Sequence, residues 1–418
     1  MSEDKFIISA SDKRRLLIGG IAGVVLVILG IMFLAMGGHH EAEGGNGHSF
    51  HWLQRVYVNL WINNVYFAGI ALTGVLFLAI QYAAQAGWSA YIKRIPEAMG
   101  AWFPWAAGLT IILYFVTNYT LPHFHLFHWL DHSLVEEGNP NYDAIIAGKS
   151  SYLNEGFFIG RMLVYYLLWI VMFWLIRRES LAEDIDGLTD HWKKMRKYSA
   201  IYIIIFAVSS SMAAWDWVMS IDPHWYSTLF GWYNFSSWFV AALAFITWVI
   251  IYLSERGYLQ QLNVGILHDM GKFVFAFSIF WAYLWISQFL LIYYANIPEE
   301  SVYFVERLKS GQYAWVFYLN LAVNFVFPFF VLMTRDSKRQ TTYLKITSLV
   351  LFIGHWFDFY LMIAPGSLQE NGHIGLMELG FFMIFTVAFI YVVLRMLTKA
   401  PLVARNHPML DESLHHQT

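Results

Sequence analysis

The sequence predicts an all-α, polytopic membrane protein with about ten transmembrane helices. Of its 418 residues, 58% are hydrophobic and only 13% are charged, whereas ordinary soluble domains carry about 25% charged residues. Apolar runs of about 20 residues recur along the chain, and each is long enough to cross the ~30 Å hydrocarbon core of a bilayer as a helix. The composition therefore disfavours a soluble fold.

Polar breaks between the apolar runs place these helices along the chain. We expect them near residues 16–37, 56–85, 98–121, 156–176, 198–220, 235–253, 272–295, 313–333, 343–363 and 375–397. The first run follows Lys13, Arg14 and Arg15 but is longer than the apolar region of a typical signal peptide, so we interpret it as a retained anchor.

The distribution of basic residues predicts the orientation of the chain. When the loops are assigned alternately to two sides, most of the 26 Lys and Arg residues fall on the side of the N-terminus. The loops assigned to the other side hold only Arg55, Lys149, Arg307 and Lys309. Because cytoplasmic loops carry the positive excess, both termini are predicted to be cytoplasmic, and the opposite face to be periplasmic in a bacterial inner (plasma) membrane.

A short internal repeat predicts how the helices are grouped. The fifth helix ends with Trp215-Asp216-Trp217 and the ninth with Phe357-Asp358-Phe359, and in both an Ile and a Pro follow at matched offsets. These helices are four apart and run in the same direction, so we expect two parallel four-helix bundles, helices 2–5 and 6–9, with helices 1 and 10 outside them.

The repeat divides the chain into four parts. We expect the N-terminus, first helix and a periplasmic loop in 1–55, the first bundle with a long periplasmic loop at 122–155 in 56–233, the second bundle in 234–374, and the last helix with a cytoplasmic tail in 375–418.

Ionisable side chains inside the spans are the main functional candidates, because burying them in lipid is costly. Arg161, Asp216 and Glu378 fall at similar depth near the periplasmic ends of three helices. His355 and Asp358 are three residues apart on the ninth helix, so they share a face and could exchange a proton. The full set of residues that we assign to a proton path is Asp216, Lys272, Gln288, His355, Asp358 and Glu378. The alternative is that Arg161 simply neutralises Asp216 or Glu378 as a buried ion pair that orients helices.

Histidines after the third helix have two interpretations. His123, His125, His128 and His132 lie close together in sequence, and His128 and His132 would share a helical face if the helix continued. A metal site is disfavoured because no second ligand motif supports it. A proton acceptor for a bound head group is the preferred interpretation, since histidine titrates near neutral pH.

Redox centres are limited by the residues that could hold them. The chain has no cysteine, which excludes cysteine-ligated iron–sulfur clusters and covalently attached haem c from it. His355 is the only histidine inside a predicted span, so a haem held by two intramembrane histidines is also disfavoured.

Several segments carry a resemblance to a known family. Those of the seventh helix are Gly271-Lys272-Phe273-Val274-Phe275-Ala276-Phe277, Phe280-Trp281-Ala282-Tyr283, Ser287-Gln288-Phe289 and Tyr294-Ala295-Asn296-Ile297-Pro298-Glu299-Glu300. They resemble the membrane subunits of alternative complex III, a bacterial quinol:cytochrome c oxidoreductase, within the wider polysulfide-reductase (NrfD-like) family. Tyr152-Leu153-Asn154, Phe157-Phe158, Arg161 and the stretch 215–231 are similar too. The compact length is more similar to the second of the two paralogous subunits, the ActF type.

The resemblance implies a quinol site on the periplasmic side. In the family, a histidine after helix 3, an acid near the start of helix 4 and an aspartate in helix 5 serve the head group. The matching positions here are His128 or His132, Glu155 (or Asn154) and Asp216, with Arg161 beside them.

The resemblance also implies cofactors and partners. Menaquinol or another quinol would be the ligand, and haem c and iron–sulfur clusters would belong to partner subunits. The expected partners are a paralogous quinol-binding membrane subunit, a periplasmic iron–sulfur subunit and cytochrome c subunits, with a terminal oxidase as a further candidate. Catalysis would exist only in the assembled complex. A structural anchor without a quinol site and a secondary transporter are the alternative functions.

Overall fold

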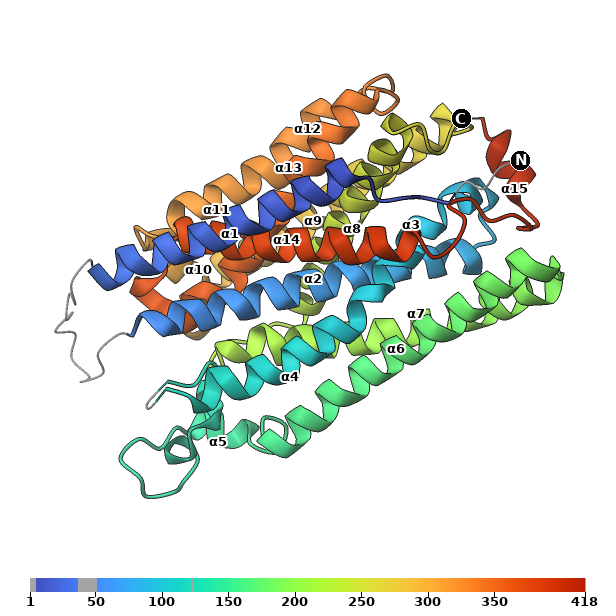
Figure 1. The fold of residues 1–418 in the computed structure, drawn as a ribbon. Helices are drawn as coiled ribbons and strands as arrows, with labels where there is room; N and C mark the ends of the chain where they lie inside the picture. The colour runs from blue at the N-terminus through green and yellow to red at the C-terminus, as the bar shows by residue number, and fades with distance from the viewer. Residues whose placement is uncertain (1–4, 37–50, 122–123, 418) are drawn as a thin grey trace.

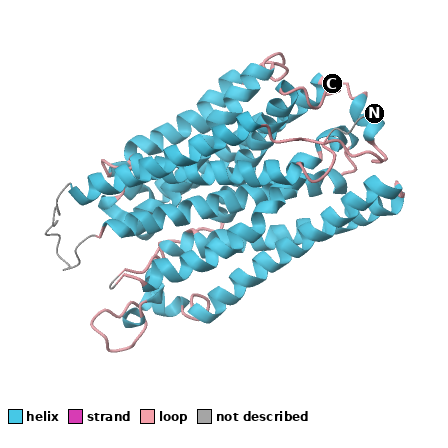
Figure 2. Ribbon diagram, viewed as in Figure 1, coloured by secondary structure: helices cyan, strands magenta, loops and turns pink. Residues whose placement is uncertain are grey.

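The computed structural model of the chain describes residues 5–36, 51–121 and 124–417. Ten helices in this part are long and apolar enough to span a membrane, which confirms the predicted fold class. These spans are Ala10–Met36, Trp52–Ala83, Arg94–Tyr119, Glu155–Asp186, Thr189–Ile221, Leu229–Glu255, Val264–Ala295, Ala314–Val331, Thr341–Asn371 and Leu376–Leu397. The described residues contain no strand, and Figure 2 shows helices throughout.

Individual helices take their labels from Figure 1. Six of the spans consist of α1 (Ala10–Met36), α2 (Trp52–Ala83), α6 (Glu155–Asp186), α8 (Leu229–Glu255), α9 (Val264–Ala295) and α14 (Leu376–Leu397). The others contain α3 (Arg94–Met99) with α4 (Phe103–Tyr119), α7 (Thr189–Trp217), α11 (Ala314–Leu321) with α12 (Phe327–Val331), and α13 (Thr341–Leu368). Shorter helices are α5 (Ala144–Lys149), α10 (Pro298–Lys309) and α15 (Leu410–Leu414).

The helices form two rings of four, as the repeat predicted. In the first ring α2 packs on α4, α4 on α6, α6 on α7, and α7 back on α2. In the second ring α8 packs on α9, α9 on α12, α11 on α13, and α13 back on α8. The rings meet where α2 and α7 contact α8. Helices α1 and α14 lie outside both rings, and α14 packs on α2.

Both termini lie at one end of this assembly, here called the terminal end, and the opposite end is called the distal end (Figure 1). An isolated antiparallel bridge joins Lys5 to Pro401 there. An even number of spans places the termini on the same side, which agrees with the predicted topology.

Hydropathy predicted each membrane-spanning helix but not all of its ends. Helix α6 continues about ten residues past the predicted end to Asp186, where Gly187, at φ 68°, caps it in the left-handed region. Helix α7 begins at Thr189, before the predicted start. Charged residues such as Glu, Lys and Arg favour helix well, so these helices extend beyond their apolar parts. The predicted spans marked the apolar parts only.

Helix α10 was not predicted at all. It lies in the distal loop between α9 and α11 and begins with Pro298. Glu299 and Glu300 lie in its first turn, and Arg307 and Lys309 in its last turn. This order complements the helix dipole and stabilises a short helix.

Helix α1 is held to the rest of the protein mainly through α14. Glycines of both helices allow the two backbones to approach closely. A Cβ added at Gly380 of α14 would lie 2.7 Å from the Gly23 carbonyl oxygen, and one added at Gly30 of α1 would lie 2.6 Å from Met377. Small residues at such crossings let transmembrane helices pack by van der Waals contact.

Replacing Gly380 with leucine is expected to separate α1 from α14, because the new side chain must displace the backbone of α1. Overpacking of this kind costs about 1–3 kcal/mol. The chain has no native cysteine, so disulfide formation in a Gly19→Cys/Val387→Cys background measures the contact directly. The same substitution at Gly108, where nothing lies within 4 Å of an added Cβ, is the control. Undiminished crosslinking with Gly380→Leu would contradict this packing.

Candidate functional site

The acid of the first ring, Asp216, is closed in an ion pair. It lies near the distal end of α7 and is 1% exposed. Arg161 of α6 donates Nε to Oδ2 at 2.8 Å and Nη2 to Oδ1 at 2.9 Å, and the Tyr165 hydroxyl donates to Oδ2 at 3.0 Å. A bidentate pair of this kind is strong and geometrically specific. Of the two partners considered for Arg161, the structure therefore selects Asp216.

Aromatic side chains and the long distal loop cover this ion pair. The Arg161 guanidinium lies 3.9 Å from the ring centroid of Tyr152 and 4.2 Å from that of Phe157. The Ser220 hydroxyl donates to the Asp216 carbonyl at 2.5 Å, and Trp129 of the loop donates its indole N–H to Ser220 at 3.4 Å. The loop after α4 therefore packs onto the end of α7 that carries the acid.

The loop histidines do not share a helical face, so that expectation was wrong. Helix α4 ends at Tyr119, shortly before a proline at position 122, and proline disfavours helix at the residue that precedes it. His128 and His132 lie in separate 3₁₀ turns, and both side chains are exposed. His123 lies outside the described residues.

The acid near the start of helix 4 lies outside the ion pair. Glu155 is the first residue of α6 and is exposed. Its Oε1 accepts a hydrogen bond from the Tyr119 hydroxyl at 2.5 Å. Of the five residues assigned to quinol binding, the structure joins Arg161 and Asp216. His128, His132 and Glu155 are exposed.

The acid of the second ring, Asp358, has a different environment. It is fully buried on α13 and accepts hydrogen bonds from neutral groups on three other helices. The donors are Tyr233 Oη of α8, Trp281 Nε1 of α9 at 2.8 Å and Asn320 Nδ2 of α11 at 2.7 Å. Within ion-pair distance, the only described side chain that could act as a cation is His355, whose Nδ1 is 4.0 Å from Oδ2.

The two acids occupy matched positions, and so do their partners. Arg161 and Tyr165 lie one turn apart on α6, and Asn320 and Asn324 have the same spacing and the same distance from the helix start on the α11 span. Arg161 and Asn320 both bond the acid, while Asn324 donates to Asn320 Oδ1 at 2.6 Å. The repeat therefore places a cation beside Asp216 and a neutral amide beside Asp358.

A π-helical turn interrupts the span of α11 and α12 beside Asp358. It covers Ala322–Val326 and contains Asn324. Pro328 follows and cannot donate an N–H to the carbonyl four residues earlier, which is that of Asn324. Single π turns are frequent at functional sites.

His355 is oriented by a serine and not by the acid. Its Nδ1 lies 3.0 Å from the Ser237 hydroxyl, and its ring packs edge-on against Trp281 at 5.4 Å. Its Nε2 is buried and has no hydrogen-bond partner among the described residues. A neutral imidazole can fill both roles, with one nitrogen bonded to the hydroxyl and the other left available.

Gln288 and Lys272 lie on α9, on either side of Trp281, the residue of that helix that donates to Asp358. Gln288, towards the distal end, lines a cavity of about 10 Å³ together with Tyr233 and Arg307, which is close to the volume that one water molecule needs. Tyr233 donates to Asp358, so the cavity borders a direct donor to the acid. Lys272 lies at the terminal end, half-exposed, and pairs with Asp269.

Glu378 belongs to a separate cluster with Arg55. Sequence reasoning placed Arg55 in a loop, but it lies in the first turn of α2, is 1% exposed and forms an ion pair with Glu378 at 2.5 Å. Asn59 donates to the same carboxylate at 3.0 Å. Burial and the Arg55 guanidinium hold the pKa of His373 below its usual value, so its neutral ring accepts from Arg55 Nη1 at about 3 Å.

A buried charge cluster at the terminal end was also missed. Glu97 of α3 accepts from Arg94 at 3.0 Å and from Arg177 of α6 at 2.6 Å. Lys93 donates to Glu183 at 2.6 Å. Hydropathy assigned these residues to loops because they lie outside the apolar parts of the spans. They fix α3 to α6 at the terminal end.

No group of three or more histidine, aspartate and glutamate side chains in the described part of the chain is arranged to hold a metal ion. No protein-family model matches the chain, and no curated protein is significantly similar to it. The chain is a multi-pass membrane protein of two four-helix rings, each with one buried acid.

Proposed function

We propose that this chain is an integral membrane subunit of a respiratory quinol:cytochrome c oxidoreductase of the alternative complex III type. It supports quinol binding through the first ring and proton translocation through the second, and it holds no redox centre of its own. Haem c and iron–sulfur clusters belong to its partners, which include a paralogous membrane subunit, a periplasmic iron–sulfur subunit and cytochrome c subunits.

The observation that carries this proposal is the environment of Asp358. A fully buried carboxyl group with neutral donors and, among the described residues, no arginine or lysine partner is costly as an anion. It can gain and lose a proton without breaking an ion pair. Such intramembrane acids are typical of proton relays in pumps and transporters. The buried histidine one turn away, with a free Nε2, supplies a second proton-exchanging group.

The first ring offers weaker support for a quinol head-group site than the second ring offers for a proton path. Arg161 and Asp216 lie under a loop that carries His128, His132 and the aromatic residue Trp129. A quinol hydroxyl donates one hydrogen bond and can accept another, and a neutral imidazole of an exposed loop histidine can fill either role. The resemblance of Tyr152-Leu153-Asn154 and Arg161 to the membrane subunits of alternative complex III supports the same assignment.

We place the protein in the bacterial inner membrane with both termini in the cytoplasm. The support is the basic excess in the loops of the terminal end. The distal end, with its long acidic loop and α10, would then face the periplasm and the redox partners.

A structural anchor is the second candidate. Asp216 and Glu378 are each closed by an arginine, as expected of acids that only orient helices. A secondary transporter is disfavoured, because transporters of this size commonly use inverted repeats or several broken helices, whereas the two rings here repeat in parallel.

Affinity purification of the tagged full-length chain from its native membranes tests the proposal. We expect co-purified c-type haem in the optical spectrum, iron–sulfur signals in electron paramagnetic resonance, and quinol-dependent reduction of cytochrome c by the purified sample. A chain that purifies alone, or with partners that have no redox centre, would refute it. An anchor would give the complex but no effect of substitutions at the acids.

A further inference from the structure

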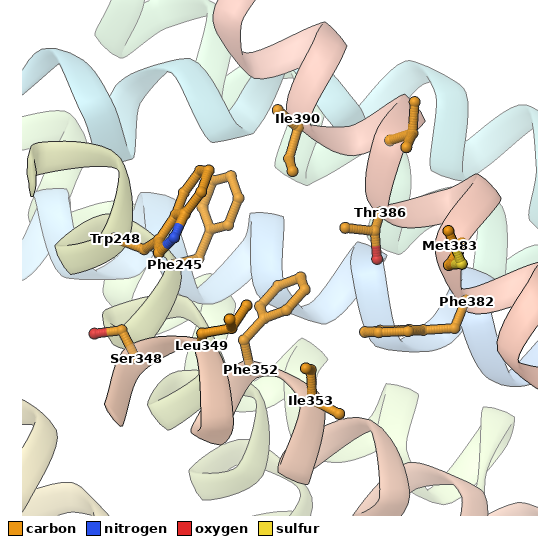
Figure 3. A pocket seen from close by; sticks show the side chains of 11 residues that line it. Phe245, Trp248, Ser348, Leu349, Phe352, Ile353, Phe382, Met383, Thr386 and Ile390 are labelled. Atoms are coloured by element: carbon orange, nitrogen blue, oxygen red, sulfur yellow. The ribbon is translucent and has the colours of Figure 1, made fainter. Parts of the chain in front are cut away.

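A cavity of about 260 Å³ lies between α8, α13 and α14, away from both buried acids. Figure 3 shows side chains of the three helices arranged around it. Its lining is almost entirely apolar and includes Phe245, Phe352, Phe382 and Ile390. Val387, which also lines it, packs against Gly19 of α1. Helix α1 therefore flanks the cavity at its terminal end.

Two lining hydroxyl groups have no partner in the described structure. They belong to Ser348 of α13 and Thr386 of α14, and Ser348 is 1% exposed. Serine and threonine in a helix usually bond the carbonyl one turn earlier, but neither does so here. A buried hydroxyl without a partner costs free energy, and a change of rotamer toward the cavity would allow it to donate to an acceptor on an occupant.

Charged residues follow the cavity-lining residues of α13 and α8 toward the terminal end. On α13, Lys345 lies one turn before Ser348 and Leu349, on the same face. It pairs with Glu255 of α8 at 2.5 Å and is 37% exposed. On α8, Arg256 lies two turns beyond the lining residue Trp248 and pairs with Asp12 of α1.

The mouth of the cavity has an excess of positive charge. Arg15 of α1 lies close to Tyr252, beside Asp12 and Arg256, and is exposed. Lys13 and Arg14 are its exposed neighbours. Lys345, Arg256 and Arg15 lie with two acidic side chains, Glu255 and Asp12, so one positive charge is unpaired and an anionic group would complete the charge balance.

We propose that this cavity holds one acyl chain of an anionic phospholipid whose phosphate lies against Lys345 and Arg15. The apolar slot takes the hydrocarbon. The terminal end is the predicted cytoplasmic end, where anionic lipids give the leaflet its negative surface potential. The lipid would fasten α1 and α14 to the second ring. This proposal does not depend on the redox assignment.

Lipid retention by the full-length protein tests the proposal. The protein, in whatever complex it purifies with, is delipidated in mild detergent. It is then titrated with phosphatidylglycerol or phosphatidylcholine of identical acyl chains, and bound lipid is counted by native mass spectrometry. We expect phosphatidylglycerol to be retained in preference to phosphatidylcholine. Lys345→Gln should weaken its binding about fivefold, since a basic residue near a membrane surface contributes about that factor. Thr386→Phe, which fills the slot, should abolish binding.

Lys399→Gln is the matched control, because Lys399 is an exposed lysine at the same end but beyond the cavity-lining part of α14, and it should leave retention unchanged. Equal retention of the two lipids, or equal effects of Lys345→Gln and Lys399→Gln, would overturn the proposal. Displacement of the lipid by menaquinone at equimolar amounts would also overturn it, since the slot would then be a tail site for quinone. Lys345→Gln alters only a surface side chain, so its result holds even if Thr386→Phe fails to fold.

Discussion

Asp358→Asn is expected to abolish proton uptake by the assembled complex and to lower its quinol-driven turnover. Asparagine keeps the shape of the side chain and one acceptor oxygen, so it can still accept from Tyr233 and Asn320 at the Oδ1 position. It loses the acceptor for Trp281 at the Oδ2 position, and it cannot exchange a proton. Loss of a positioned acid–base group typically costs about 10²–10⁴-fold in rate. Turnover with simultaneous recording of proton uptake and release, at verified subunit content, measures both effects.

The control for Asp358→Asn is Glu183→Gln, another fully buried carboxyl-to-amide change at the terminal end, where its partner is Lys93. It should leave turnover and proton uptake unchanged. If Asp358→Asn leaves both quantities unchanged in an intact complex, the chain is a structural anchor. If Asp358→Asn and Glu183→Gln lower them equally, the effect is on folding and not on proton movement.

The fold was predictable because lipid imposes simple rules on it. Apolar length identified every span, and the matched Asp216 and Asp358 motifs gave the two parallel rings. The ends of α6 and α7 and the whole of α10 were not predictable from hydropathy, because helix formation there depends on charged residues and capping outside the apolar parts. The sequence analysis also assigned Arg55 to a loop, although it lies in the first turn of α2. Hydropathy cannot distinguish a charged residue at the end of a helix from one just outside it.

The candidate site was predictable residue by residue but not pair by pair. Arg161, Asp216, His355, Asp358 and Glu378 all stood out as rare ionisable residues in apolar spans. The pairing of arginines with acids depends on how the helices of each ring are arranged, and the spacing of these residues in the sequence does not predict it. Tyr233 and Trp281 were missed as donors to Asp358, because aromatic residues are so common in this chain that none stands out.

The difference between the two rings separates the roles of their acids. Both acids occupy the same position in the repeat, yet only Asp216 has a guanidinium beside it. An ion pair fixes the charge of the carboxylate, whereas the amide of Asn320 leaves the charge of Asp358 free to change. Sequence alone could not rank the two acids. In our proposal, Asp358 is therefore the first candidate for the proton-exchanging group, and Asp216 is the first candidate for the group that stabilises its ring.

Arg161→Gln is therefore expected to have the largest effect on stability among single substitutions at the two acids' partners. It leaves the Asp216 carboxylate buried with Tyr165 as its remaining donor, and breaking one side of a buried ion pair typically costs about 3–5 kcal/mol. Thermal unfolding of the purified protein in detergent measures the loss. The double variant Arg161→Gln/Asp216→Asn should recover most of it, because two neutral amides can bond each other and no charge is left unpaired.

Asn320→Ala, at the matched position of the second ring, removes a neutral donor and should cost only about 1–3 kcal/mol. Equal losses for Arg161→Gln and the double variant would show that the arginine stabilises the ring through its packing on Tyr152 and Phe157 and not through its charge.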